Sequence, residues 1–133
     1  MKKLVLAVIA LGFSVGVNAA CTQKDLAGGW VSYAQWSNSK VVRCNLFVTA
    51  KNALLQNTST CAFVYGEPPI EYITGSLAID KYCQITGTID DGSGAPMSID
   101  AYLDKSKGVI TGMEWITANP FAFIGIFNAT KQK

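Results

Sequence analysis

Histidine is absent from the 133 residues of this chain. Its absence excludes the usual Ser–His and Cys–His forms of nucleophilic catalysis, which need an imidazole as general base. It also removes a principal zinc ligand, and no two of the four cysteines form a C-x-x-C pair. We therefore expect a protein that is not an enzyme and that holds no catalytic residue, no metal and no cofactor.

Long hydrophobic runs are also missing, apart from one near the start. The first two lysines precede an unbroken apolar run over residues 4–13, and small side chains over residues 17–20 follow. A positive start, a short apolar stretch and a small-x-small end are the parts of a cleaved secretory signal peptide. We assign residues 1–20 to this signal, with cleavage after Ala19 or Ala20. A stable membrane span would need about 20 apolar residues, so we expect none.

No excess of positive or negative charge remains once the signal is removed. Two of the eleven basic residues lie in the signal, so nine remain against nine acidic residues. A near-neutral chain has no basic field to attract nucleic acid or anionic lipid, and we expect neither as a partner. Residues 21–133 are expected to be one domain with one modest core, located in the periplasm or secreted from a bacterial cell.

The mature domain contains four cysteines, which are Cys21, Cys44, Cys61 and Cys83. In an oxidising compartment an even count indicates two disulfides. Lipidation of Cys21, directly after the cleavage site, is the alternative for that residue. Asn18, however, stands where a lipoprotein signal usually carries an aliphatic side chain.

From residue 28 onward, turn-forming residues recur about every 8–12 residues between alternating segments, which is typical of an antiparallel sandwich or barrel. A short helical turn is expected over residues 22–26. Strands are expected over residues 29–36, 41–50, 58–65, 72–80, 83–90, 97–104, 109–116 and 121–129. The predicted fold class is all-β, an eight-stranded antiparallel up-and-down barrel with two disulfides.

The expected strand order predicts which cysteines pair. It brings Cys44 nearly opposite Cys61 and places Cys21 and Cys83 at one end of the barrel. We favour these two pairings, although three connectivities exist and one sequence does not determine strand register.

Three Ile-Thr-Gly segments recur in different strands, ending at Gly75, Gly87 and Gly112. Strand glycines often mark bends or close approaches that curl a sheet; the alternative is chance recurrence.

Residues 26–31, Leu-Ala-Gly-Gly-Trp-Val, resemble the Gly-x-Trp start of the calycin barrels, which include lipocalins and avidin-like proteins. The matching residues are Gly28 and Trp30. The resemblance implies that Trp30 plugs the closed end of an eight-stranded barrel. In lipocalins an arginine late in the chain packs on this tryptophan, whereas the only arginine here is Arg43.

The first third of the chain is also similar to small secreted inhibitors of bacterial metalloproteases. The similar residues are Leu26, Gly28, Trp30, Cys44, Leu46 and Cys61. The resemblance implies a lipocalin-like barrel with a disulfide between these last two cysteines. Those inhibitors insert a free N-terminal strand into the protease cleft, whereas we expect Cys21 to tie this N-terminus down.

Aromatic side chains supply the candidate ligand site, because small-molecule sites are mostly apolar with a few polar groups. A cavity or mouth is predicted from Trp30, Tyr33, Trp36, Tyr65, Tyr72 and Trp115. The alternative is that these aromatics are ordinary core and rim residues. Asp100, Asp104 and Glu114 are expected on a solvated outer face and not as a pair of hydrolytic carboxylates.

The segment 121–127 is apolar at successive positions, so both of its faces would be apolar in a strand. Such a strand is a candidate homodimer contact, with burial under the N-terminal arm as the alternative. The leading function is non-enzymatic binding of a small or apolar ligand inside the barrel. The alternative is inhibition of a secreted enzyme, or another protein interaction, through the loops.

Overall fold

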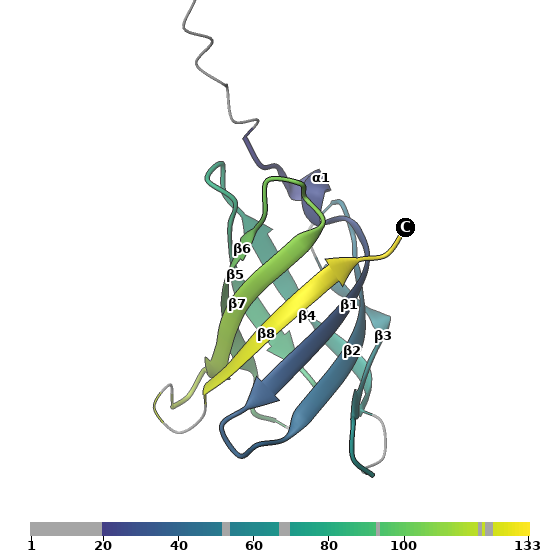
Figure 1. The fold of residues 1–133 in the computed structure, drawn as a ribbon, viewed down its shortest axis with the longest axis vertical. Helices are drawn as coiled ribbons and strands as arrows, with labels where there is room; N and C mark the ends of the chain where they lie inside the picture. Colours follow the sequence, from purple (N-terminus) through teal and green to yellow (C-terminus); the bar gives the residue numbers. More distant parts are fainter. Residues whose placement is uncertain (1–19, 52–53, 67–69, 93, 120, 122–123) are drawn as a thin grey trace, which may run out of the picture.

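The computed structural model describes residues 20–51, 54–66, 70–92, 94–119, 121 and 124–133. These residues form α1 (Gln23–Leu26), β1 (Gly28–Trp36), β2 (Val41–Val48), β3 (Leu54–Phe63), β4 (Ile70–Ile79), β5 (Gln84–Asp90), β6 (Met97–Leu103), β7 (Val109–Ile116) and β8 (Ile124–Lys131). The strands close into a barrel in sequence order, and β1 pairs antiparallel with β8 (Figure 1). The predicted fold class is therefore confirmed. The predicted signal falls almost entirely outside the described residues and stays a prediction.

The observed strand bounds lie close to the predicted ones, and the differences have local causes. β3 begins at Leu54 and not at residue 58, because its first residues pair with Gly75 and Ser76 of β4. β5 begins after Cys83, whose backbone has a left-handed φ of 70°. β8 extends to Lys131 because its last residues pair with β1.

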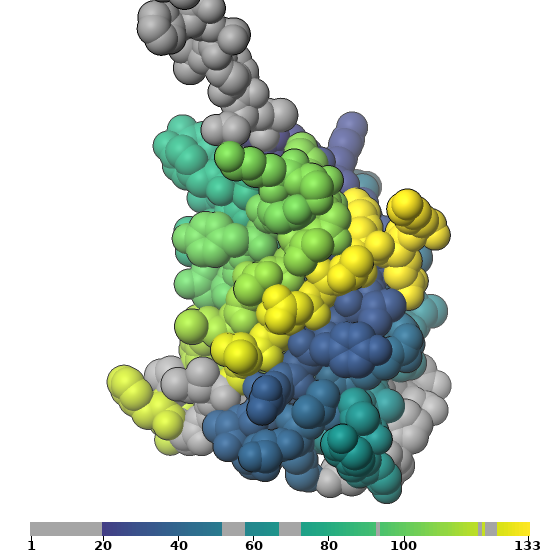
Figure 2. Space-filling model, viewed as in Figure 1, coloured from purple at the N-terminus to yellow at the C-terminus, as the bar shows by residue number. Residues whose placement is uncertain are grey.

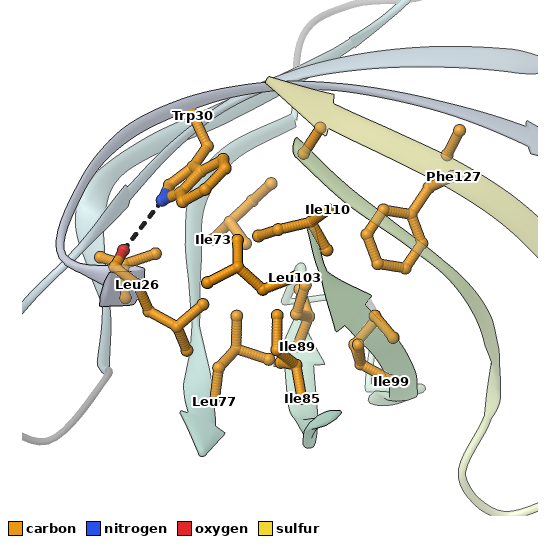
Figure 3. Packing of buried hydrophobic residues seen from close by; sticks show 14 of the residues in the cluster. Leu26, Trp30, Ile73, Leu77, Ile85, Ile89, Ile99, Leu103, Ile110 and Phe127 are labelled. Carbon is orange, nitrogen blue, oxygen red and sulfur yellow. Dashed lines mark hydrogen bonds between the residues drawn. The ribbon is translucent and has the colours of Figure 1, made fainter. Parts of the chain in front are cut away.

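The predicted alternation places one face of each strand in the core. In β6, for example, Ile99, Ala101 and Leu103 are buried, as expected of alternate positions in a strand. Side chains from strands all around the barrel meet in its interior (Figure 3). Those labelled there are Leu26, Trp30, Ile73, Leu77, Ile85, Ile89, Ile99, Leu103, Ile110 and Phe127.

The three glycines of the Ile-Thr-Gly segments lie where neighbouring strands approach most closely. A Cβ atom on Gly75 would overlap the Thr88 carbonyl oxygen, and one on Gly87 would overlap the Ser76 carbonyl oxygen. A Cβ atom on Gly112 would overlap the side chain of Ala101. The predicted close approach is confirmed, and it lets the sheet curl tightly enough to close.

One end of the barrel is closed by α1 and Trp30. The Trp30 indole Nε1 donates to the Leu26 carbonyl oxygen at 2.8 Å, and both side chains are buried (Figure 3). Lys131 places its Nζ 5.3 Å from the centroid of the Trp30 ring, so a late lysine packs on this tryptophan. The part of the chain that the structure describes has no helix long and apolar enough to cross a membrane.

Asp25 joins α1 to the loops and to the C-terminal strand at this closed end. Its Oδ2 atom lies 2.9 Å from Lys107 Nζ, and its backbone oxygen accepts a hydrogen bond from Lys131 Nζ at 2.9 Å. The Lys107 hydrogen bond is the main reason that the pKa of Asp25 lies below its ordinary value. The helix is thus held against the barrel by charged contacts as well as by Leu26.

Both predicted disulfides are present. Cys44 and Cys61 are paired directly opposite each other in the register of β2 and β3, with a Cα–Cα distance of 4.0 Å. Cys21 and Cys83 join the N-terminal arm to the turn before β5, with a Cα–Cα distance of 5.0 Å. No cysteine of the described chain is free, so Cys21 serves as a disulfide partner.

The pairing of β2 with β3 is irregular beside this disulfide. The register shifts between Asn45 and Val48, which disturbs the ladder of backbone hydrogen bonds. Ser59, which is fully buried, accepts a hydrogen bond on its Oγ atom from the Phe47 backbone N–H at 2.8 Å. The serine hydroxyl therefore replaces a strand partner for this amide.

Candidate functional site

A small chamber occupies the barrel interior at the end opposite α1. It has a volume of about 40 Å³ and is lined by Ser32, Ala34, Trp36, Val42, Cys44, Leu46, Cys61, Ile73, Ile89, Asp91, Met97, Ile99, Glu114 and Phe127. Side chains of β7, β8, β1 and β2 cover the barrel wall on the face seen in Figure 2, with no opening through it. The loops after β1, β5 and β7 lie at this open end (Figure 1).

A hydrogen bond between Trp36 and Glu114 crosses this open-end chamber. The indole Nε1 of Trp36, the last residue of β1, donates to Glu114 Oε1 at 2.6 Å. Gly125 of β8 pairs with Trp36 on one side and with Glu114 on the other. The three residues therefore form one row across adjacent strands, in which the central residue has no side chain.

Gly125 provides the space that this hydrogen bond needs. A Cβ atom at this position would lie 2.8 Å from Trp36 Cδ1 and 3.0 Å from Glu114 Oε1. Both distances are shorter than ordinary van der Waals contacts to carbon. Glycine at this position thus allows the indole and the carboxylate to meet over β8.

Glu114 is unusual among the acidic residues because its side chain points inward and is only 6% exposed. Burial raises its pKa above the ordinary value, and the Trp36 hydrogen bond lowers it by a smaller amount. Among the described residues, no lysine or arginine lines the chamber. Asp91 lines it as well, so the ionisable groups among the described lining residues are both acids.

The expectation that Glu114 lies on a solvated face is wrong. In β7 the inward positions are Ile110, Gly112 and Glu114, so the carboxylate follows two small or apolar residues into the interior. The alternation of β7 is visible in the sequence. An acid is usually solvated, however, so its residue type suggests the outer face even where the alternation places it inward. Asp100 and Asp104 lie outside the chamber lining and form no carboxylate pair with Glu114.

Of the five predicted ligand-site aromatics whose side chains the structure describes, only Trp36 lines the open-end chamber. Trp30 lies at the closed end, and Tyr33 and Tyr65 are 52% and 81% exposed. Trp115 follows the inward Glu114 in β7 and therefore faces the outside of the barrel. The side chain of Tyr72 lies outside the described residues. The structure thus separates these aromatics between the two ends and the outer wall.

Trp36 also contacts the rim of the barrel. Its ring packs edge-on against Phe63, with ring centroids 5.5 Å apart, and the Lys40 ammonium lies 4.9 Å from the centroid of Phe63. A cation at the rim thus sits on Phe63, which packs against the Trp36 ring. This packing orients the Trp36 ring, and the hydrogen bond to Glu114 orients its N–H.

No protein-family model matches this chain, and no curated protein sequence is significantly similar to it.

Proposed function

We propose that this protein is a non-enzymatic binding protein that holds a small, largely apolar ligand at the open end of its barrel. The observation that carries the proposal is the open-end chamber, a largely apolar space that contains the hydrogen-bonded pair Trp36 and Glu114. Ligand sites commonly combine apolar walls with a few placed polar groups. The two disulfides support action in an oxidising compartment outside the cytoplasm.

The size of the chamber limits what it can enclose. Ligand pockets typically measure about 300–1,000 Å³, whereas this chamber has about 40 Å³, enough for a few water molecules. The ligand is therefore very small, or it inserts one end into the chamber and leaves the rest among the open-end loops. A long lipid held wholly inside the barrel is not proposed.

Binding of a fluorescent apolar probe tests this function. The disulfide-bonded protein is titrated with N-phenyl-1-naphthylamine, and small apolar compounds are then used to displace it. Ala34 lines the chamber, so Ala34→Leu fills part of it. Ala78 is exposed on β4, so Ala78→Leu is the matched control. We expect the first variant to weaken probe binding about tenfold or more and the control to leave it unchanged.

A second chamber variant keeps the test valid if Ala34→Leu does not fold. Ser32 is buried and lines the chamber, so Ser32→Val changes its polarity with a smaller change in volume. Circular dichroism shows whether each variant keeps the fold. Failure of the unaltered protein to bind the probe, or equal binding by all variants that keep the fold, would contradict the proposed site.

Protein recognition by the open-end loops is the second candidate, and two exposed aromatics favour it. Tyr65 and Phe121 are 81% and 93% exposed near this end. Insertion of a free N-terminal strand into a protease is not favoured, because Cys21 is buried and bonded to Cys83. Inhibition of a panel of secreted metalloproteases, abolished by Tyr65→Ser but not by Ala34→Leu, would support this second candidate over the first.

A further inference from the structure

The open-end chamber holds a carboxylate, and none of its described lining residues is a lysine or arginine. Glu114 Oε1 accepts the Trp36 indole N–H, and no hydrogen bond or ion pair from a described residue reaches Glu114 Oε2. Removing a carboxylate from water costs free energy unless a partner compensates for the lost hydration. A single neutral indole N–H is weak compensation. The described residues contain no buried side-chain oxygen or nitrogen without a hydrogen-bond partner, so Oε2 keeps some accessible surface and a ligand in the chamber can reach it.

The rest of the chamber wall has the same sign of charge. Asp91 lines the chamber together with Glu114, and no basic side chain of the described residues does. The lone arginine, Arg43, is exposed on the outer face of β2. An anionic or phosphorylated ligand would meet the Glu114 carboxylate and no basic group among the described lining residues, so this part of the wall disfavours such ligands.

The apolar part of the wall suits a cation with a hydrocarbon body. The Trp36 indole can attract a cation through its ring as well as donate through its N–H. Met97, Ile99 and Phe127 provide apolar surface around it. Gly125 leaves open the space that brings the indole and the carboxylate together. Trp36, Gly125 and Glu114 thus place a hydrogen-bonded polar pair beside apolar side chains.

We propose that the open-end chamber recognises the ammonium group of a small primary amine, which is held by Glu114 while its hydrocarbon body packs on Trp36 and Met97. This inference rests on the proposed function, because it specifies the ligand class of the same site. The ammonium group supplies the charge and the N–H donors that the carboxylate lacks. Hydrogen bonds between an ammonium group and a carboxylate are stronger than hydrogen bonds between two neutral groups.

The discriminating experiment compares three ligands of one chain length. Calorimetric titration of the disulfide-bonded protein uses n-hexylamine, n-hexanol and hexanoate at neutral pH, with displacement of N-phenyl-1-naphthylamine as a second readout. We expect the amine to bind about 10- to 100-fold more tightly than the alcohol, and hexanoate to bind most weakly. Tighter binding of the alcohol or of hexanoate than of the amine would overturn the proposal.

A variant of the carboxylate tests its role directly. Glu114→Gln keeps the shape and the acceptor for Trp36 while removing the charge. We expect amine affinity to fall about tenfold or more and hexanol affinity to stay the same. Asp100→Asn, on the outer face of β6, is the matched control and is expected to change neither. Unchanged amine binding by a folded Glu114→Gln variant would also overturn the proposal.

The ligand-class inference and the proposed function fail in different ways. If neither the fluorescent probe nor any hexyl compound binds, the proposed function itself is wrong. If the probe and hexanol bind but the amine has no advantage, only the amine inference is wrong. If free ammonium ion competes as well as the amine does, the hydrocarbon body contributes nothing and the chamber is an inorganic cation site, which again contradicts the inference.

Discussion

Trp36 and Glu114 are 78 residues apart in the sequence, and their side chains form a hydrogen bond of 2.6 Å inside the barrel. The bond lies over Gly125, so it ties β1 to β7 across the intervening strand β8. At the other end of β1, Lys131 of β8 packs on Trp30. Side-chain contacts therefore hold the junction of β1 and β8 at both ends.

The first prediction concerns the pH dependence of stability. Burial raises the pKa of Glu114 above its ordinary value of 4.5. The unfolded chain then releases this proton at a lower pH than the folded protein, so the free energy of unfolding falls as pH rises from about 4.5 through the folded-state pKa. Glu114→Gln should remove this loss. Urea unfolding of both proteins over the acidic to neutral range measures it, with Asp100→Asn as control.

The opposite pH dependence of the free energy of unfolding would contradict this prediction. If the free energy of unfolding rises with pH over this range in the native protein and the rise disappears in Glu114→Gln, the carboxylate is stabilised by folding. Its burial would then not be the dominant influence on its pKa. Addition of n-hexylamine should reduce the loss at higher pH, because the bound ammonium favours the ionised carboxylate.

The second prediction concerns Gly125. Gly125→Ala puts a methyl group against the Trp36 ring and the Glu114 carboxylate, and overpacking of this kind costs about 1–3 kcal/mol. Gly29→Ala is the matched control, because a methyl group there meets only the flexible end of Gln132. Chemical unfolding measures both, and tryptophan fluorescence reports displacement of the Trp36 ring. Equal effects of the two substitutions would contradict the spacing role assigned to Gly125.

The third prediction compares the two disulfides. Their sequence separations are 62 residues for Cys21–Cys83 and 17 residues for Cys44–Cys61. The loop-entropy model assigns about 4 kcal/mol to a loop of the first size and about 3 kcal/mol to the second. We expect paired Cys→Ala substitutions to destabilise the protein in that order. Unfolding of each double variant by guanidinium measures it, and the reverse order would show that local packing outweighs chain entropy.

The fourth prediction concerns Ser59. Its Oγ atom accepts the Phe47 N–H where the register of β2 and β3 shifts. Ser59→Ala leaves this partly buried amide without its acceptor, at a cost of about 1–3 kcal/mol. Thr88→Ala, at an exposed position of β5, should cost less than about 0.5 kcal/mol. Hydrogen exchange at Phe47 gives a local readout, and unchanged exchange would refute the role of the hydroxyl.

The barrel and its disulfides were predictable because their signals are local and repeated. Alternation in β6, turn residues at regular intervals and the positions of Cys44 and Cys61 in neighbouring strands all agree on one strand order. The register shift beside Asn45 was not predictable, because it depends on Ser59 from another strand. The packing of Lys131 on Trp30 was not predictable either, because the lipocalin resemblance implies an arginine at this place.

The candidate site was harder to predict, because residue type alone does not say which way an aromatic side chain points. Tyr33 sits between inward Ser32 and Ala34, so alternation turns it outward despite its apolar ring. Glu114 was placed on the wrong face because acids are usually solvated. The signal that identifies it is its position two residues after Gly112, on the inward face of β7.

The pairing of β1 with β8 affects the order in which the parts of the barrel fold. All the other neighbours in the barrel are consecutive hairpins, whereas Trp30 must find Lys131 across almost the whole length of the barrel sequence. Such distant pairings are slow to form, because a long loop must close first. The hairpin of β2 and β3 can oxidise its cysteines before that, so we expect a kinetic intermediate with Cys44–Cys61 formed while the barrel is still unclosed. The junction of β1 and β8 is then the last part of the barrel to form.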